Sequence, residues 1–528
     1  MATLSRRHFL GAAGASAATI ALWSAGMSAS PAWAAPRFPG DPFRLGVASG
    51  DPLPDGVVLW TRLAPDPLAV DGRGGMPDRK VNVRWQVAED EGFGRVVRQG
   101  HTFATPELGH AVHAEVTGLQ PGREYFYRFR TDNDFSPVGR ARTAPAPGVR
   151  VDELAFAFAS CQNWYEGFYT AYRHMAAEDL DFVVHLGDYL YEYGVGANAG
   201  VRNMQLDESF QRETVTLPEY RNRYALTKLD ADLQAAHAAF SWIQTWDDHE
   251  VENNWANELA EPDRDGFPDD DPAFFRARKV AAFQAYYEHM PLRLPQRPSG
   301  ASIELYRRVG FGGLLDLHVL DTRSFRSNQV LDTTTDERHN PSRTMLGDAQ
   351  ERWLLDGAGA SAAVWNVLAN QTLIAQADHD ANPAATRWGN DLWDGYTAAR
   401  ARLLGGLHER RAHNPVVLTG DIHRSVVCDL KLDFDDERSP VVGTEFAGSS
   451  ISSAKDGQPT DQLGRDWLAA NPHMKFHNSQ RGYVSCRVTP QTWRTDYRIV
   501  PFVTRPDAPV ETAGSFVVEA GRPGAVPA

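Results

Sequence analysis

The sequence predicts a layered fold of the α/β or α+β type, preceded by a smaller domain made only of strands. Between residues 43 and 143, short runs of alternating polar and apolar residues are separated by Pro, Gly and Asp. From about residue 152, apolar runs typical of buried strands alternate with longer helical or irregular stretches. The first pattern is typical of a β-sandwich, and the second pattern is typical of sheets covered by helices.

The strand-rich region has its own sequence signature. Strand-like runs lie at residues 56–61, 81–87, 111–116 and 124–129. The segment Leu119-Gln120-Pro121-Gly122, with tyrosines at 125 and 127, resembles the late-strand corner of fibronectin type III domains. We therefore expect a small fibronectin- or immunoglobulin-like β-sandwich over residues 35–147, which ends in a Pro-rich linker.

The second block is expected to form the main domain, over residues 148–500. Strands are expected at residues 154–159, 181–186, 240–246, 313–320, 364–369, 416–419 and 441–446, with a helix over 167–178. Residues 257–271 are acidic and rich in Pro and Gly, which indicates a surface insertion. Residues 501–528 are expected to form a C-terminal tail.

The first 34 residues are expected to be an export signal. Arg6 and Arg7 precede Phe9-Leu10 and a mildly apolar run, and Ala32-Trp33-Ala34 follows as a cleavage motif. The arginine pair resembles a bacterial twin-arginine signal, which implies the twin-arginine export machinery as a partner and a periplasmic or extracellular location. An ordinary secretory signal or an unstructured start is the alternative. We expect no membrane span elsewhere.

Charge and cysteine content exclude several classes of function. The net charge of −15 argues against nucleic acid or an anionic membrane as the main partner. An acidic enzyme still binds phosphate esters where metal ions supply positive charge. Three cysteines do not make a disulfide framework, and spacing leaves open whether Cys428 and Cys486 pair.

Nearly every expected strand of the second block ends in residues that bind metals or take part in catalysis. These strand ends read Ser160-Cys161-Gln162-Asn163, Gly187-Asp188-Tyr189-Leu190-Tyr191-Glu192, Asp247-Asp248-His249-Glu250, Asn370-Gln371 and Gly420-Asp421-Ile422-His423. In layered α/β folds, ligands bind outside the carboxyl ends of the strands. We therefore expect these five loops to converge on one site.

Each motif alone has an ordinary structural interpretation. Asp188 suits a turn or cap, Asp247–His249 suits a solvated helix start, and Cys161 suits a small buried hydrophobe. Tyr191 alone is more often a core or rim residue. Asp421 and His423 lie on the same face of an extended segment, which is a good chelating geometry. The shared position at strand ends favours a functional interpretation.

Together these motifs resemble the calcineurin-like metallophosphoesterases. The order of the blocks is the same, but a cysteine replaces the first aspartate, aspartates replace an asparagine and a histidine, and a tyrosine follows Gly-Asp. This combination, with Trp246–Asn254 and Asp391–Tyr396, resembles the PhoD family of alkaline phosphatases and phosphodiesterases. The resemblance covers nearly the whole chain and implies a β-sandwich core of layered sheets with flanking helices.

The residue types are consistent with two different metals. Thiolate and phenolate favour Fe³⁺, so Cys161, Asp188, Tyr191 and His423 are expected to hold iron. Carboxylates suit Ca²⁺, with Asp188 as a bridge. The calcium side takes Asp248 and Asp421, with Asp247 or Asn370 as further ligands and Asn254 as another metal or substrate contact. The resemblance implies the same Fe³⁺ and Ca²⁺ pairing, with one or two calcium ions.

The expected reaction is hydrolysis of small phosphate mono- or diesters by in-line attack of a metal-held hydroxide. His249 is expected to bind phosphate or protonate the leaving oxygen. Three alternatives remain open: a diesterase acting on teichoic acid or on phospholipids in the manner of phospholipase D, a dizinc or dimanganese hydrolase, and a non-enzymatic calcium-stabilised surface protein. No Gly-x-Ser-x-Gly motif lies near these strand ends.

Overall fold

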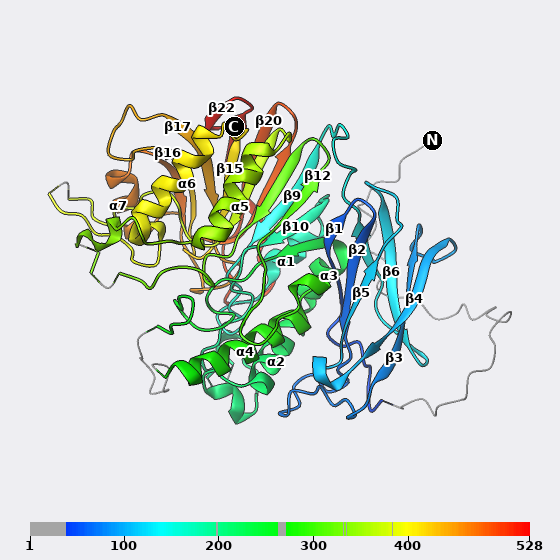
Figure 1. Cartoon of the computed structure of the whole chain (residues 1–528). Helices are drawn as coiled ribbons and strands as arrows, with labels where there is room; N and C mark the ends of the chain where they lie inside the picture. Colours follow the sequence, from blue (N-terminus) through cyan, green and yellow to red (C-terminus); the bar gives the residue numbers. More distant parts are fainter. Residues whose placement is uncertain (1–37, 197–198, 262–270, 331, 334, 383) are drawn as a thin grey trace.

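Two β-sheets lie face to face, and helices cover the outer face of each (Figure 1). The computed structural model describes residues 38–528, except 197–198, 262–270, 331, 334 and 383. The expected export signal at residues 1–34 and most of the insertion at 257–271 lie outside the described residues. The predicted α/β class of layered sheets with flanking helices is confirmed.

The larger sheet has ten strands in the order β22-β21-β20-β19-β9-β10-β11-β1-β2-β5. In that order they span Arg522–Pro527, Glu511–Glu519, Thr492–Val500, Arg481–Val488, Leu154–Ala159, Phe182–His185, Ser241–Gln244, Val47–Leu53, Gly56–Arg62 and Ala111–Val116. Strands β9, β10, β11 and β1 are parallel to one another. The two outermost strands, β21 and β22, come from the segment expected to be a tail.

The smaller sheet has seven strands in the order β12-β13-β14-β15-β17-β16-β18. They span Arg307–Phe311, Leu315–Val319, Trp365–Asn370, Pro415–Thr419, Val441–Ala447, Ser425–Lys431 and Met474–Asn478. Strands β13, β14, β15 and β17 are parallel. Each sheet therefore has a parallel centre, so the carboxyl ends of neighbouring strands meet at one edge.

Residue size along the strands decides how the layers pack. In β9, Phe156 and Phe158 enter the core between the two sheets, whereas the alternating alanines face the helices. The Phe182 ring stacks on the Phe156 ring, with 4.8 Å between the ring centres, and on the Phe311 ring of the smaller sheet, with 4.2 Å between the ring centres. Large rings fill the space between the sheets, and small side chains let the helices approach.

Seven α-helices form the outer layers of the described chain. Helices α1 Thr170–Ala176, α2 Leu217–Lys228, α3 Ala231–Ala239 and α4 Pro272–His289 pack on the larger sheet, and α5 Gly347–Ala360, α6 Thr397–Glu409 and α7 Gln462–Ala470 pack on the smaller sheet. Short 3-10 helices span Pro106–Leu108, Gly200–Arg202, Glu208–Gln211, Leu294–Gln296, Asp336–His339 and Trp393–Tyr396. Local sequence starts these helices: Thr216 and Glu219 form a capping box at α2, and Asp230 caps α3.

The N-terminal strands are shared between two layers. A five-stranded sheet contains β4 Val96–Ala104, β3 Val81–Ala88, β6 Glu124–Thr131, β7 Asp134–Phe135 and β8 Gly139–Arg142. It packs on β1, β2 and β5, which also belong to the larger sheet through the parallel β1–β11 pair. The expected β-sandwich is therefore hydrogen-bonded into the main domain, and its boundary at residues 147–148 stays a prediction.

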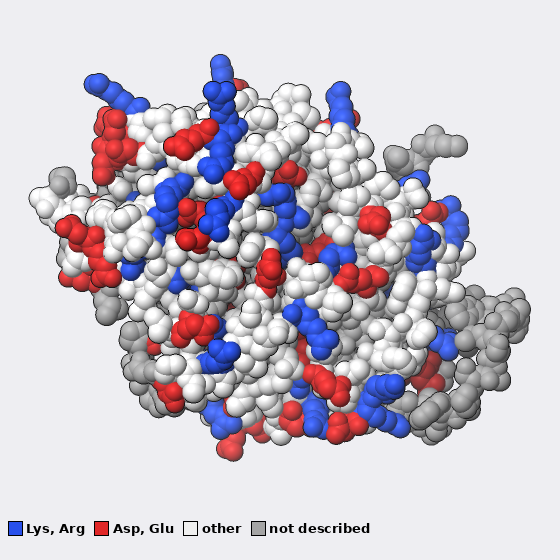
Figure 2. Space-filling model, in the orientation of Figure 1, with Lys and Arg blue, Asp and Glu red and all other residues white. Residues whose placement is uncertain are grey.

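Charges of both signs are interspersed over the face shown in Figure 2. Among the helices of the described chain, none combines the length and the apolar character that a membrane span requires.

One lysine is buried without a carboxylate beside it. Lys228, at the end of α2, is 1% exposed and lies 4.3 Å from the centre of the Trp60 ring. Within the described residues, its ammonium group is hydrogen-bonded only to the Tyr189 hydroxyl, at 3.0 Å. Burial lowers the pKa of Lys228 from 10.5 to about 7, because the charged form loses its hydration.

We expect Lys228→Met to flatten the pH dependence of stability. Between pH 7 and 10.5 the unfolded chain binds more protons at this lysine than the folded chain, so burial of Lys228 makes the free energy of unfolding rise with pH. The full shift corresponds to roughly 5 kcal/mol. Urea unfolding at pH 7, 8.5 and 10 measures the slope for wild type and variant. Lys80→Met, at an exposed position, is the control; equal slopes for wild type and Lys228→Met would contradict the prediction.

Candidate metal centre

The candidate site lies where the carboxyl ends of seven parallel strands meet. Strands β9, β10 and β11 contribute from the larger sheet, and β13, β14, β15 and β17 contribute from the smaller sheet. All five predicted loops follow one of these strands. The loops after β13 and β17 also reach the site, and sequence analysis did not include them.

Three groups of side chains in this region could each hold a metal ion. They are Cys161 with Asp188 and His423, Asp188 with Asp248 and His249, and Asp247 with Asp248 and Asp421. Within each group, the ligand atoms lie within 4.8 Å of one another. Asp188 belongs to the first two groups and Asp248 to the last two, so the groups form one continuous chain. Shared carboxylates of this kind suit neighbouring cations.

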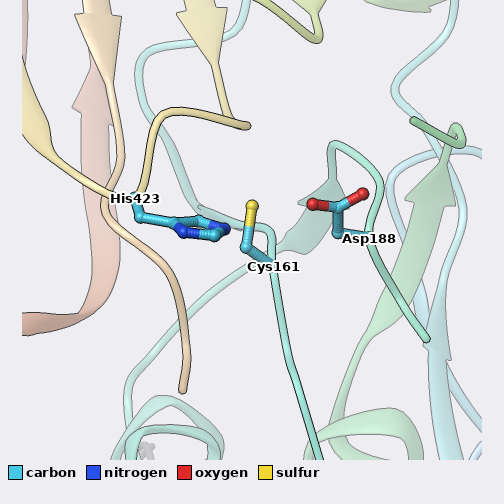
Figure 3. Close-up of side chains that lie close together, drawn as sticks. All are labelled: Cys161, Asp188 and His423. Carbon is cyan, nitrogen blue, oxygen red and sulfur yellow. The ribbon is translucent and has the colours of Figure 1, made fainter. Parts of the chain in front are cut away.

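The first group combines sulfur, imidazole and carboxylate donors. Figure 3 shows the Cys161 sulfur between the His423 ring and the Asp188 carboxylate, and each of these residues comes from a different loop. The Tyr191 hydroxyl lies 3.0 Å from both Asp188 Oδ2 and His423 Nε2. The structure therefore brings all four predicted iron-side residues together.

The backbone is strained at half of the predicted site residues. Among these residues, positive φ angles occur at Cys161 (60°), Asp188 (56°), Asn254 (58°), Asp421 (64°) and His423 (52°). Such conformations cost about 1–3 kcal/mol each and are concentrated at functional sites. Next to Asp188, Gly187 has a φ of 112°, and a Cβ there would lie 2.3 Å from the Asp247 amide nitrogen. The Gly-Asp motif is therefore required by the close approach of two loops.

The electrostatics of the site fit cations. Burial, together with neighbouring carboxylates, raises the pKa of Asp188, Asp421 and Cys161 well above their ordinary values. Among the predicted site residues, three buried oxygens have no hydrogen-bond partner in the described part of the chain, namely Asp188 Oδ1, Asp247 Oδ2 and Asn370 Oδ1. The side-chain NH2 group of Asn370 donates to Thr372 O, so the side-chain oxygen of Asn370 points away from Thr372. Unpartnered oxygen atoms that lie among several carboxylates are well suited to bind metal ions.

His249 is oriented by a carboxylate that sequence analysis did not select. Glu192 Oε2 lies 2.7 Å from His249 Nδ1, and Glu192 is fully buried. Burial of His249 opposes its charge, but Glu192, Asp248 and Asp188 together raise its pKa well above 6.5. The bond to Glu192 leaves Nε2 as the free ring nitrogen, so His249 can donate a proton or a hydrogen bond from that side.

Other missed residues hold the loops in place. Glu250 accepts hydrogen bonds from the backbone of Asp188, Tyr189 and Asp247. Ser453, in the loop after β17, lies 2.7 Å from the Tyr191 hydroxyl. Glu192 and Glu250 lie inside predicted motifs and could have been selected, whereas nothing in the local sequence marks Ser453.

The structure also places Asn254 and the two other cysteines. Asn254 donates its backbone N–H to Asp248 Oδ2 at 2.7 Å, while its side-chain amide donates to Glu261. This backbone contact orients Asp248, and the expected role of Asn254 as a metal or substrate contact stays a prediction. Cys428 and Cys486 are free buried thiols in different sheets, so the disulfide left open by the sequence is not formed.

We expect Glu192→Gln to lower kcat about tenfold without loss of metal. Glutamine can still accept a hydrogen bond from the backbone N–H of Asn253, but it cannot stabilise a charged His249 ring. Loss of a carboxylate that orients an active-site histidine typically costs about 10- to 100-fold. Steady-state kinetics on p-nitrophenyl phosphate and elemental analysis measure both quantities. Glu351→Gln, which removes a carboxylate paired with Arg402 on the outer helices, is the control. An unchanged kcat in Glu192→Gln would contradict the role of Glu192.

The two-sheet core with these strand-end loops defines a metallophosphoesterase fold. A purple acid phosphatase from yellow lupin seeds has the same fold, with a TM-score of 0.53, 10% identity, and coverage of 91% of this chain and 75% of that one. The chain belongs to the PhoD-like phosphatase family, whose model matches residues 156–497. The model of the family's N-terminal domain matches residues 28–145.

Two relatives support this assignment over nearly the whole chain. Alkaline phosphatase D of Bacillus subtilis strain 168 is 48% identical over 503 residues, which cover 93% of this chain and 83% of that protein. The solved structure of PhoD is 47% identical, covers 93% of both chains and has a TM-score of 0.88. The predicted family and enzyme class are confirmed: the chain is a phosphoester hydrolase.

Proposed function

We propose that this chain is an exported alkaline phosphatase that hydrolyses phosphate mono- and diesters with an Fe³⁺ and Ca²⁺ centre. The observation that carries the proposal is the asymmetry of the site. A thiol, a phenol and an imidazole lie on one side of Asp188, and carboxylates lie on the other. The first set favours trivalent iron, and the second favours a cation that prefers oxygen ligands.

The ligands divide between the two sides. Cys161, Asp188, Tyr191 and His423 would hold iron. Asp188 and Asp248, with Asp421, would hold calcium, while Asp247 and Asn370 each offer an unpartnered oxygen. Bound cations supply Lewis acidity, which lowers the pKa of water and neutralises charge on the phosphoryl oxygens.

The chain's own residues then orient and protonate the substrate. The buried Glu192 carboxylate fixes the tautomer and orientation of His249. From that position His249 binds a phosphoryl oxygen or transfers a proton to the leaving oxygen. In this mechanism no side chain attacks phosphorus to form a covalent intermediate. The reaction is therefore a single in-line displacement, which inverts the configuration at phosphorus. Net retention, or a phosphoserine intermediate, would contradict this mechanism.

Two measurements on natively exported protein test the proposal. Elemental analysis should find iron and calcium, and the pure protein should show an absorption band from thiolate-to-iron charge transfer. Rates on p-nitrophenyl phosphate and bis-p-nitrophenyl phosphate then measure the preference between mono- and diesters. Zinc or manganese in place of iron would overturn the metal assignment, and exclusive hydrolysis of the diester would favour a phosphodiesterase acting on teichoic acid or phospholipids.

Export rests on the sequence signal alone. The pair Arg6-Arg7 and the cleavage motif ending at Ala34 support twin-arginine export to the periplasm or the extracellular space. Replacing both arginines by lysine should keep the precursor inside the cell. Unchanged secretion of that variant would favour an ordinary secretory signal.

A further inference from the structure

A fully buried arginine lies within the carboxylate side of the candidate centre. Arg323 follows β13 and is 0% exposed. Its Nε lies 2.5 Å from Asp247 Oδ1, and its Nη2 lies 3.2 Å from Asp421 Oδ1 and 3.6 Å from Asp248 Oδ1. These three aspartates are the members of the third metal-binding group. One guanidinium therefore contacts every carboxylate of that group.

The opposite edge of Arg323 is anchored to the protein. Its Nη1 donates to both oxygens of Asp391, at 2.8 and 3.0 Å. Asp391 also accepts hydrogen bonds from Arg326 and Gln329, and Arg326 in turn donates to the backbone oxygens of Asn254 and Trp255. The planar fork of Arg323 is therefore held at one edge and presents its other edge to the metal-binding carboxylates.

The contacts of Arg323 leave one oxygen of Asp247 available. Asp247 uses Oδ1 on Arg323, while its buried Oδ2 has no partner within the described chain. Four aspartates, at 247, 248, 391 and 421, share two guanidinium groups, those of Arg323 and Arg326, so the carboxyl groups outnumber their cationic partners.

We propose that Arg323 is a positioning residue of the divalent-metal site, which orients Asp247, Asp248 and Asp421 so that their remaining oxygens converge on one ion. This inference rests on the proposed function, because that function assigns a divalent ion to this group. Two opposing effects decide the outcome of mutation. Loss of a positive charge strengthens attraction for a cation, whereas loss of the fork releases the three carboxylates. We expect the loss of orientation to decide the outcome, since groups that hold metal ligands in place typically contribute 10- to 100-fold in metal affinity.

Calcium titration distinguishes the two effects. Iron-loaded wild type, Arg323→Gln and Arg323→Lys are stripped of divalent ions with a chelator, and Ca²⁺ binding is measured by calorimetry. We expect both variants to bind Ca²⁺ about 10- to 100-fold more weakly, with iron content and the charge-transfer band unchanged. Lysine retains the charge but not the fork, so it should fail to rescue. Arg400→Lys, which alters another buried arginine–aspartate pair outside the site, should bind calcium as the wild type does.

Each other outcome overturns the inference. Wild-type affinity in Arg323→Lys would show that charge alone suffices, and tighter binding in Arg323→Gln would show that Arg323 only repels the ion. Thermal unfolding in chelator separates a general loss of stability from a loss of affinity. If Arg323→Gln does not fold, Arg323→Lys still decides the question. If the wild type itself does not bind Ca²⁺, the proposed calcium site is wrong. If the wild type binds Ca²⁺ and the variants bind it equally well, only the role of Arg323 is wrong.

Discussion

Asp188→Asn is expected to lower kcat/KM by roughly 1,000-fold or more, the largest of the effects predicted for this protein. Asp188 is shared by two of the three metal-binding groups, and its Oδ1 is buried without a partner in the described structure. Asparagine keeps the shape but lacks the negative charge, and only one of its side-chain atoms can bind a metal. One substitution therefore weakens both metal positions.

Metal analysis and kinetics on the same preparation test this expectation. Asp188→Asn should contain less iron and less calcium than the wild type. Asp316→Asn, on β13 and bonded to Ser361, removes a carboxylate away from the site and should retain activity and both metals. Wild-type metal content together with low activity would show that Asp188 acts on the substrate and does not bridge the metals.

Cys161→Ser is expected to remove the thiolate-to-iron absorption band and to lower activity by roughly 100-fold. Burial and the nearby Asp188 raise the pKa of the Cys161 thiol well above its ordinary value, so the thiolate form requires a cation beside it. Serine fills nearly the same volume but is a poorer ligand for iron. Loss of the band therefore reports the sulfur ligand directly.

Another buried cysteine provides the matched control. Cys486 lies in β19 with its sulfur 3.9 Å from Thr495 Oγ1, so a serine there also finds a hydroxyl partner. Cys486→Ser should keep iron, colour and activity. A coloured, fully active Cys161→Ser protein would exclude Cys161 as a ligand and would leave Tyr191 as the source of the colour.

The parts of the fold that were predicted from sequence depend on local patterns. The alternation of Phe and Ala in β9 indicates a strand whose two faces pack against different layers. In the structure, one face packs against the smaller sheet and the other face packs against helices. Polar residues that directly follow buried strands predicted a common site, and those loops do meet. Gly187 shows why a short motif can be informative, because the adjacent loop leaves no room for a side chain.

The missed parts depend on contacts between distant residues. Arg323 is hydrogen-bonded to Asp247, which is 76 residues away in the sequence, and Ser453 is hydrogen-bonded to Tyr191, which is 262 residues away. A single arginine or serine in a loop is common, so its position in the sequence does not show which charge or hydroxyl it will meet. The same applies to β1, whose parallel pairing with β11 merges the N-terminal strands into the main sheet.

The sequence by itself determined the class of fold, the family, and which residue types stand at the strand ends. These properties follow from the period of apolar residues and from short motifs, both of which are local. Only the tertiary structure decided that Asp188 links two groups of donors, that Glu192 orients His249, and that Arg323 lies among the aspartates. The physical reason is that buried charges are stabilised by their partners, and folding selects those partners from segments that lie far apart in the chain.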